Sequence, residues 1–287
     1  MQKEAPFVSV LMTAFNRENF IAEAIESVLT SSYTNFELVI VDDCSTDKTF
    51  EIIQYFAIKD KRIRYYQNEK NLGDYPNRNR AASYAKGYYI TYLDSDDNLL
   101  IDGLKNCIEA MLQFPEAGVG MYWSYSKGQA FCLNGPEAIR QHFFYRQLLI
   151  IGPGGTVLKR SFFEHLKGYP EKYGPANDMY FNLKAACYSE LVLFPFAFSF
   201  YRLHDAQENK NEYSYLYNNY LYQKDALNEL SLPFSLKERE WLANKNKRRF
   251  LVNIIKYFFK NRNPKEVMQA IRLTRYSLKD LMNGLFH

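Results

Sequence analysis

Short apolar runs alternate with amphipathic stripes through the first 122 residues of the chain. Apolar positions between the runs recur every three or four residues, the spacing of a helix with one buried face. The runs themselves are rich in β-branched and aromatic side chains and predict strands. They cover residues 7–13, 36–41, 63–67, 88–93 and 117–122. Strands that alternate with helices predict an α/β fold with a mixed, mostly parallel sheet flanked by helices.

The pattern loosens beyond residue 124. A short strand is predicted at 156–159, a long aromatic strand at 191–201, and polar loops around 68–76, 152–155 and 174–178. From residue 212 onward the pattern is helical, with breaks at Pro233 and Pro264. The sequence therefore predicts one α/β domain over residues 1–210, in two halves (1–122 and 123–210). A C-terminal helical extension is predicted over 211–287.

Composition narrows the class of protein. The chain has 287 residues, 47% of them hydrophobic, which is ordinary for a globular protein. Its four cysteines are too scattered for a zinc site or a disulfide framework, so we expect a reduced, cytoplasmic protein. The N-terminus has no basic-then-apolar signal pattern, and no run approaches 18 apolar residues.

Three carboxylates, Asp94, Asp96 and Asp97, follow the predicted strand 88–93 where it ends. In an open α/β sheet this end of a strand is where ligands bind. Carboxylates so close repel one another, and a divalent cation removes that cost. Oxygen ligands of this kind suit Mn²⁺ or Mg²⁺. The alternative is an Asp-rich turn that caps the next helix.

Two common nucleotide motifs are absent. No Gly-x-Gly-x-x-Gly follows the first predicted strand, and the chain has no Gly-x-x-x-x-Gly-Lys-Ser/Thr loop. A bound nucleotide would therefore be held by other means.

Several segments together resemble the family 2 glycosyltransferases. These are bacterial enzymes with the GT-A fold that move a sugar from a nucleoside diphosphate to an acceptor hydroxyl. Each segment alone is weak, but their order and strand context make the match specific. The matching segments are 8–16, 36–45, 77–81, 85–90 and the acidic 93–97, within a resemblance that runs from about residue 8 to about residue 204.

The resemblance assigns roles to the acidic residues. Asp96 is expected to bind the cation directly, with His204 as a further ligand or a contact to the diphosphate. Asp94 is expected to touch the ribose or a metal-bound water. Asp97 is expected either to support the cation ligands without binding the cation itself or to cap a helix. Asp178 is the expected general base. From the residues alone, Asp178 could equally be a helix N-cap, and His204 a polar surface residue.

The nucleoside is expected across the first two strand ends, in the 1–122 half. Thr13, Phe15 and Asn16 would meet the base and ribose, and Asp43 could accept the uracil N3 proton. The alternative is that Asp42 and Asp43 form an Asx turn without a binding role. Arg78 suits the diphosphate, because a guanidinium matches phosphate geometry.

Other positions are expected near the sugar. Gly154 and Gly155 allow backbone to approach a ligand closely, although loop glycines need no such role. Asn177 stands where the family usually has Glu, and Phe15 where Tyr is frequent. Ser95 lies between the acidic residues and joins the expected nucleotide contacts.

The resemblance implies an inverting, metal-dependent transferase, with a UDP-sugar as the expected donor. The acceptor would be a saccharide or a lipid-linked saccharide, in cell-surface polysaccharide or lipid-linked glycan synthesis. A sugar nucleotidyltransferase would carry a Gly-rich loop with a catalytic Arg or Lys after the first strand, which residues 13–17 lack. A haloacid-dehalogenase-type phosphatase would place Asp-x-Asp on its first strand. A catalytically inactive nucleotide-sugar-binding module remains a further alternative.

Charge is unevenly distributed along the chain. Residues 234–287 hold 13 Lys and Arg against 4 Asp and Glu, a local charge of +9 within an overall +4. Aromatic and apolar residues are interleaved with this charge, which suits a helix lying on an anionic membrane. A helix packed on the catalytic domain with a basic outer face explains the pattern nearly as well. A nucleic acid is a third candidate partner for this basic, aromatic segment, but nothing else in the chain supports it.

Overall fold

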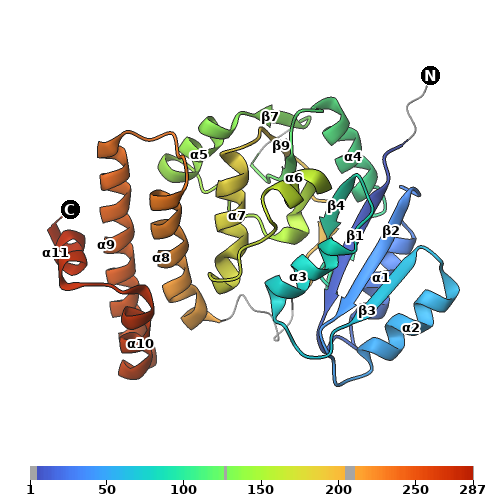
Figure 1. Ribbon diagram of the computed structural model, residues 1–287, viewed down its shortest axis with the longest axis horizontal. Helices are drawn as coiled ribbons and strands as arrows, with labels where there is room; N and C mark the ends of the chain where they lie inside the picture. Colours follow the sequence, from blue (N-terminus) through green and yellow to red (C-terminus); the bar gives the residue numbers. More distant parts are fainter. Residues whose placement is uncertain (1–4, 126–127, 204–210, 287) are drawn as a thin grey trace.

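An eight-stranded sheet with helices on both faces forms the centre of the protein (Figure 1). The computed structural model describes residues 5–125, 128–203 and 211–286. The strand order is β3-β2-β1-β4-β8-β6-β9-β7. These strands are β1 Val8–Ala14, β2 Phe36–Asp42, β3 Ile63–Gln67, β4 Tyr89–Tyr92, β6 Val119–Tyr122, β7 Phe131–Leu133, β8 Thr156–Lys159 and β9 Leu191–Phe194.

The sheet is parallel at its N-terminal end and mixed beyond it. β1 pairs in parallel with β2 and β4, β2 with β3, and β6 with β9. β8 is antiparallel to both β4 and β6, and β7 is antiparallel to β9. The predicted mixed α/β sheet is confirmed.

Both faces of the sheet are buried, because successive side chains of a strand point to opposite sides. Along β1, Val10 and Met12 join one hydrophobic cluster, whereas Leu11 joins the other. Helices cover both clusters. They are α1 Ile21–Leu29, α2 Thr49–Lys59, α3 Asp74–Ser83, α4 Gly103–Gln113, α5 Gly135–Phe144, α6 Arg160–His165 and α7 Asn177–Ala186, with short 3₁₀ turns at Pro153–Gly155 and Gly174–Ala176.

Two predicted boundaries are wrong. The aromatic run 191–201 is not one strand, because β9 ends before Pro195, which has no N–H for the ladder. The run resumes as β10 Ser199–Phe200, paired antiparallel with β5 Asn98–Leu99. The predicted loop 68–76 ends early, because α3 begins at Asp74 and holds Pro76 in its first turn, where proline is tolerated.

Four helices follow the sheet. They are α8 Glu212–Glu229, α9 Leu236–Asn261, α10 Pro264–Thr274 and α11 Leu278–Phe286. Ser235 and Glu238 form a capping box at the start of α9, and Asn263 caps α10 ahead of Pro264. The predicted breaks at both prolines are confirmed. No helix in the described part of the chain is both long and apolar enough to cross a membrane.

The first two C-terminal helices pack on the rest of the molecule. Tyr222 and Ala226 of α8 and Leu242 of α9 belong to the same hydrophobic cluster as α7 and one face of the sheet. A smaller cluster joins α8, α9 and α10 through Tyr220, Phe250 and other side chains. The domain boundary at residue 210 stays a prediction, and deleting the helices would uncover this shared core.

A buried polar network fixes the turn that leads into β4. Ser9 Oγ donates to Glu37 Oε1 (2.6 Å) and accepts from Gly87 N–H (2.8 Å). Arg64 Nη1 lies 2.8 Å from Glu37 Oε2, so the buried carboxylate is paired. Gly87 lies so close to β1 that a Cβ there would be 2.4 Å from Ser9 N and 2.8 Å from the carbonyl carbon of Val8.

We therefore expect Gly87→Ala to lower the free energy of unfolding by about 2–3 kcal/mol, because the backbone of β1 must shift to admit the methyl group. Urea denaturation measures this change. Gly154→Ala is the matched control, because the nearest atom to a Cβ there is 3.9 Å away. Equal stability of the two variants would contradict the prediction.

Candidate active site

The carboxyl ends of β1, β2 and β4 meet at one edge of the sheet, and the loops that follow β1 and β2 are locked together. Asn16 N–H donates to Ser45 Oγ (2.9 Å), and Thr46 N–H donates to Asn16 Oδ1 (2.9 Å). Asn16 and Cys44 have φ of 52° and 64°, the left-handed region that Asn tolerates better than most residues. Asn16 therefore shapes the floor on which a nucleotide is expected.

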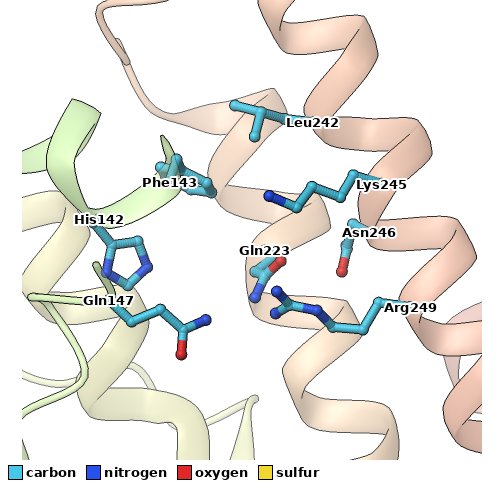
Figure 2. Close-up of a pocket in the computed structure, with 8 residues that line it drawn as sticks. All are labelled: His142, Phe143, Gln147, Gln223, Leu242, Lys245, Asn246 and Arg249. Carbon is cyan, nitrogen blue, oxygen red and sulfur yellow. The ribbon is translucent and has the colours of Figure 1, made fainter. Parts of the chain in front are cut away.

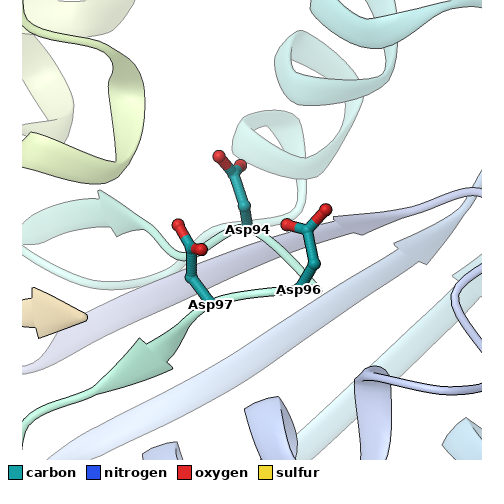
Figure 3. Close-up of side chains that lie close together, drawn as sticks. All are labelled: Asp94, Asp96 and Asp97. Carbon is teal, nitrogen blue, oxygen red and sulfur yellow. The ribbon is translucent and has the colours of Figure 1, made fainter. Parts of the chain in front are cut away.

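Asp94, Asp96 and Asp97 converge just beyond β4 (Figure 3). Each offers one oxygen, and these oxygens all lie within 4.8 Å of one another. The pKa of Asp97 is raised to about 7, mainly by burial. The charges of Asp94 and Asp96 contribute to this rise, and the backbone N–H of Arg202 opposes it. Carboxylate oxygens at this spacing form a donor set that fits a divalent cation such as Mn²⁺ or Mg²⁺.

Arg17 ties the loop after β1 to this acidic cluster. Its Nε lies 3.0 Å from Asp96 Oδ2, and its Nη1 donates to the carbonyls of Phe15 and Asn16 at 3.1 Å. The sequence prediction missed Arg17. A basic residue directly after Asn16, in a segment already expected to meet the nucleoside, was the available signal.

Arg78 is buried between two carboxylates with part of its guanidinium unused. Its Nε donates to Asp74 Oδ1 at 2.7 Å, and its Nη2 lies 2.8 Å from Asp94 Oδ1 without the angle of a hydrogen bond. Nη1 has no hydrogen-bond partner among the described residues. A buried donor left unpaired is costly, so this geometry favours an anionic ligand beside Asp94. Asp74, which orients Arg78, was also missed.

Asp178 is the second residue of α7 and only 7% exposed. The N-cap of this helix is Ala176, so neither Asp178 nor Asn177 caps it. Burial raises the pKa of Asp178 to about 7, against the opposing effects of the Met179 N–H and the Arg78 charge. A carboxylate that titrates near neutral pH is suited to taking a proton from a substrate.

The loop of residues 152–155, called the glycine loop here, lies between Asp178 and the acidic cluster. A Cβ on Gly152 would be 3.6 Å from Asp178 Oδ2, and one on Gly154 would be 3.9 Å from Asp94 Oδ2. Ser199 Oγ donates to the Gly154 carbonyl at 3.3 Å, which holds the loop from the β10 side. Gly155 packs against Ile151 instead. The structure thus brings Asp94, Gly154 and Asp178 into one site.

Asp43 is buried and already engaged. Its Oδ1 accepts from Asn68 Nδ2 (2.7 Å) and Leu72 N–H (2.9 Å), and its Oδ2 accepts from Gly73 N–H (2.9 Å). In this structure the carboxylate holds the loop that precedes α3. A contact with uracil stays a prediction and would use the remaining lone pair of Oδ2.

The other predicted residues lie in different settings. Phe15 is 42% exposed and Thr13 half-buried at the end of β1, whereas Ser95 is buried. Asn177 is buried too, and its Oδ1 accepts from Tyr173 N–H (2.9 Å) in the turn before α7. His204 lies outside the described residues.

Comparison with known proteins identifies the family. The family model described as glycosyl transferase family 2 matches residues 9–167, more than half of the chain. The chain belongs to this family.

Several curated relatives share part of the chain. TuaG of Bacillus subtilis, a putative teichuronic acid biosynthesis glycosyltransferase, is 40% identical over 108 residues, which are 38% of this chain and 43% of TuaG. WcaA of Escherichia coli, a putative colanic acid biosynthesis glycosyl transferase, is 43% identical over 97 residues, 33% of this chain and 34% of WcaA. The chain thus spans less than half the length of these relatives.

Solved structures match nearly the whole chain. TarS 1–349 of S. aureus in complex with UDP-GlcNAc superposes with a TM-score of 0.74 at 19% identity, over 97% of this chain and 89% of that one. A mannosyltransferase of Pyrobaculum calidifontis in complex with GDP-Man and Mn²⁺ gives 0.62 at 15% identity, over 99% and 88%. These similarities establish the GT-A fold.

We expect Asp96→Asn to weaken Mn²⁺ binding by at least about tenfold, because it removes a charged oxygen from the cluster. Electron paramagnetic resonance of Mn²⁺ measures free and bound ion directly. Asp102→Asn is the control, since Asp102 is an exposed carboxylate that accepts from Ser32 Oγ outside the cluster. Equal Mn²⁺ affinity of the Asp96 variant and the unchanged chain would contradict a cation site here.

Proposed function

We propose that the protein is an inverting glycosyltransferase that moves a sugar from a UDP-sugar to an acceptor hydroxyl. One observation carries this proposal. A buried carboxylate with a raised pKa, Asp178, faces an acidic cluster across a glycine loop, at the edge where parallel strands end. The arrangement would supply a base on one side of this loop and a diphosphate site on the other.

The diphosphate would lie between Asp94, Asp96 and Arg78. A divalent cation held there would act as a Lewis acid on the leaving diphosphate. The unpaired Nη1 of Arg78 would donate to a phosphate oxygen, and Arg17 would exchange Asp96 for the incoming charge. The solved complexes of TarS with UDP and UDP-GlcNAc support the choice of a uridine nucleotide.

Transfer would proceed by single displacement. The acceptor oxygen attacks the anomeric carbon as the bond to the diphosphate oxygen breaks, and Asp178 takes the proton from the acceptor hydroxyl. The backbone of Gly152 and Gly154 would line the sugar, because these glycines lie beside Asp178 and Asp94.

The names of the relatives TuaG and WcaA support a role in polysaccharide biosynthesis. We infer a saccharide or lipid-linked saccharide acceptor. A lipid-linked acceptor would explain the apolar and basic surface of α9.

That surface is only part of the apolar stripe seen in the sequence. Phe250 and Ile254 are buried against α8 and α10, as the packing alternative expects. Phe259 is 62% exposed and Phe258 37% exposed, however, and Lys256 and Lys260 lie on the same turns. Exposed rings flanked by cations suit the surface of an anionic membrane.

Transfer should depend on the ionisation of Asp178. Because the protonated carboxyl cannot take a proton, we expect the rate to fall about tenfold per pH unit below about pH 7. Asp178→Asn should lower transfer by about a hundredfold or more and leave UDP affinity within about twofold of the unchanged chain.

Screening UDP-sugars for hydrolysis provides a donor for the rate measurement, and calorimetry gives the UDP affinity. A flat profile between pH 5 and 8, or transfer that survives in Asp178→Asn, would place the base elsewhere.

We expect the double variant Phe258→Ser, Phe259→Ser to lower cosedimentation with phosphatidylglycerol vesicles several-fold, because two exposed rings are lost. The control is Ile58→Ser with Leu112→Ser, two exposed apolar residues on α2 and α4. If both double variants bind vesicles alike, the membrane surface is not on α9.

A further inference from the structure

A polar pocket lies where α5, α8 and α9 meet, among residues outside the candidate active site (Figure 2). Its floor holds three buried polar side chains: His142 of α5, Gln223 of α8 and Asn246 of α9. Lys245, Arg249 and Gln147 stand at its rim and are exposed. Apolar side chains would be the ordinary filling between packed helices, so this polar lining needs a cause.

His142 places an unused hydrogen-bond donor in the floor. Its Nδ1 accepts from Leu149 N–H at 3.0 Å. Burial, with the Arg249 charge, lowers the pKa of His142 to about 4, so the ring is neutral at pH 7. A neutral ring that accepts at Nδ1 carries its proton on Nε2. Nε2 is turned into the pocket, and no described residue accepts from it.

The two amides of the floor are anchored by one N–H each. Gln223 Nε2 donates to Tyr222 Oη (3.1 Å), and Asn246 Nδ2 donates to the Tyr220 carbonyl (3.0 Å). Each NH₂ group has a second proton. The second proton of Gln223 is available to a ligand in the pocket beside His142.

Among the described residues that line the pocket, two carry a positive charge and none a negative one. Lys245 and Arg249 lie one turn apart on α9, and neither forms an ion pair within the described chain. Lys245 is also held over the Trp241 ring, 4.7 Å from its centroid. Like charges at this helical spacing repel each other, and an anion between them would remove that repulsion.

The size of the pocket limits the ligand. Its enclosed space is about 20 Å³, room for one or two water molecules. A nucleotide or a sugar ring cannot enter. One oxygen of an oxyanion can, while its other oxygens remain between the exposed cations of the rim.

We propose that this pocket binds a phosphate group. One phosphate oxygen accepts from His142 Nε2–H and the Gln223 amide, and the others pair with Lys245 and Arg249. This pocket is separate from the proposed donor site, because the two share no residue. A ligand here links α5 to α9. It also borders the segment 147–151, whose Leu149 and Ile151 carbonyls accept from Asn182 of α7.

Histidine-selective ¹⁵N labelling tests the proposal in the full chain. The sequence has only four histidines, and His142→Gln identifies the resonance of His142. Titration with inorganic phosphate should shift the His142 Nε2–H signal. The double variant Lys245→Gln, Arg249→Gln should weaken that titration at least about tenfold, because both charges facing the phosphate are removed.

The matched control is Lys237→Gln with Arg248→Gln, which removes two exposed charges from the same helix outside the pocket. It should titrate like the unchanged chain. If the His142 signal ignores phosphate, or shifts alike in both double variants, the proposal is wrong.

A phosphodiester of glycerol, titrated in the same way, separates the sources of the phosphate. A similar shift with the diester means that the site binds a phosphate group that is part of a larger molecule, such as a polymer or a lipid headgroup. A shift with inorganic phosphate alone means that the free ion is the ligand. No shift with either overturns the site.

Discussion

Parallel pairing of β1 with both β2 and β4 is the constraint on which the rest of the structure depends. It brings three strand ends to one edge of the sheet, so that residues more than 70 positions apart become neighbours. Asp43 N–H donates to the Ala14 carbonyl, and Leu93 N–H donates to the Leu11 carbonyl, which extends the ladders past the strand ends. This backbone pairing brings the acidic cluster after Leu93 to the edge of the sheet, and the side chain of Arg17 then contacts it from the β1 side.

Electrostatics then divides the carboxylates of the site into two kinds. Asp94 and Asp96 lie beside the guanidinium groups of Arg78 and Arg17. Asp178 is buried at the start of α7 with less compensation, so its pKa is raised to about 7. The different surroundings suit a buried carboxylate to taking up a proton and carboxylates in the acidic cluster to binding a cation.

The C-terminal helices extend this plan without entering the sheet. α8 completes the core against α7, and α9 lies on α8 with apolar contacts inward and basic side chains outward. The polar pocket at the junction with α5 interrupts that apolar packing. There, buried donors and a pair of cations face a common space.

Local sequence patterns were enough to predict the alternation of strands and helices, the acidic segment 93–97 after the fourth predicted strand, and the family resemblance. These follow from local periodicity and short motifs, which depend on neighbouring residues alone. The sequence also marked Asp178, but left open whether that residue caps a helix.

The partners of these residues depend instead on how the chain folds. Arg17 contacts Asp96, which is 79 positions away in the sequence. Asp43 accepts hydrogen bonds from the backbone N–H groups of Leu72 and Gly73 in the loop before α3. The split of residues 191–201 into β9 and β10 also depends on pairing with β5, far away in the sequence. Burial and long-range pairing set these contacts and the raised pKa values, and neither is encoded in the spacing of residues along the chain.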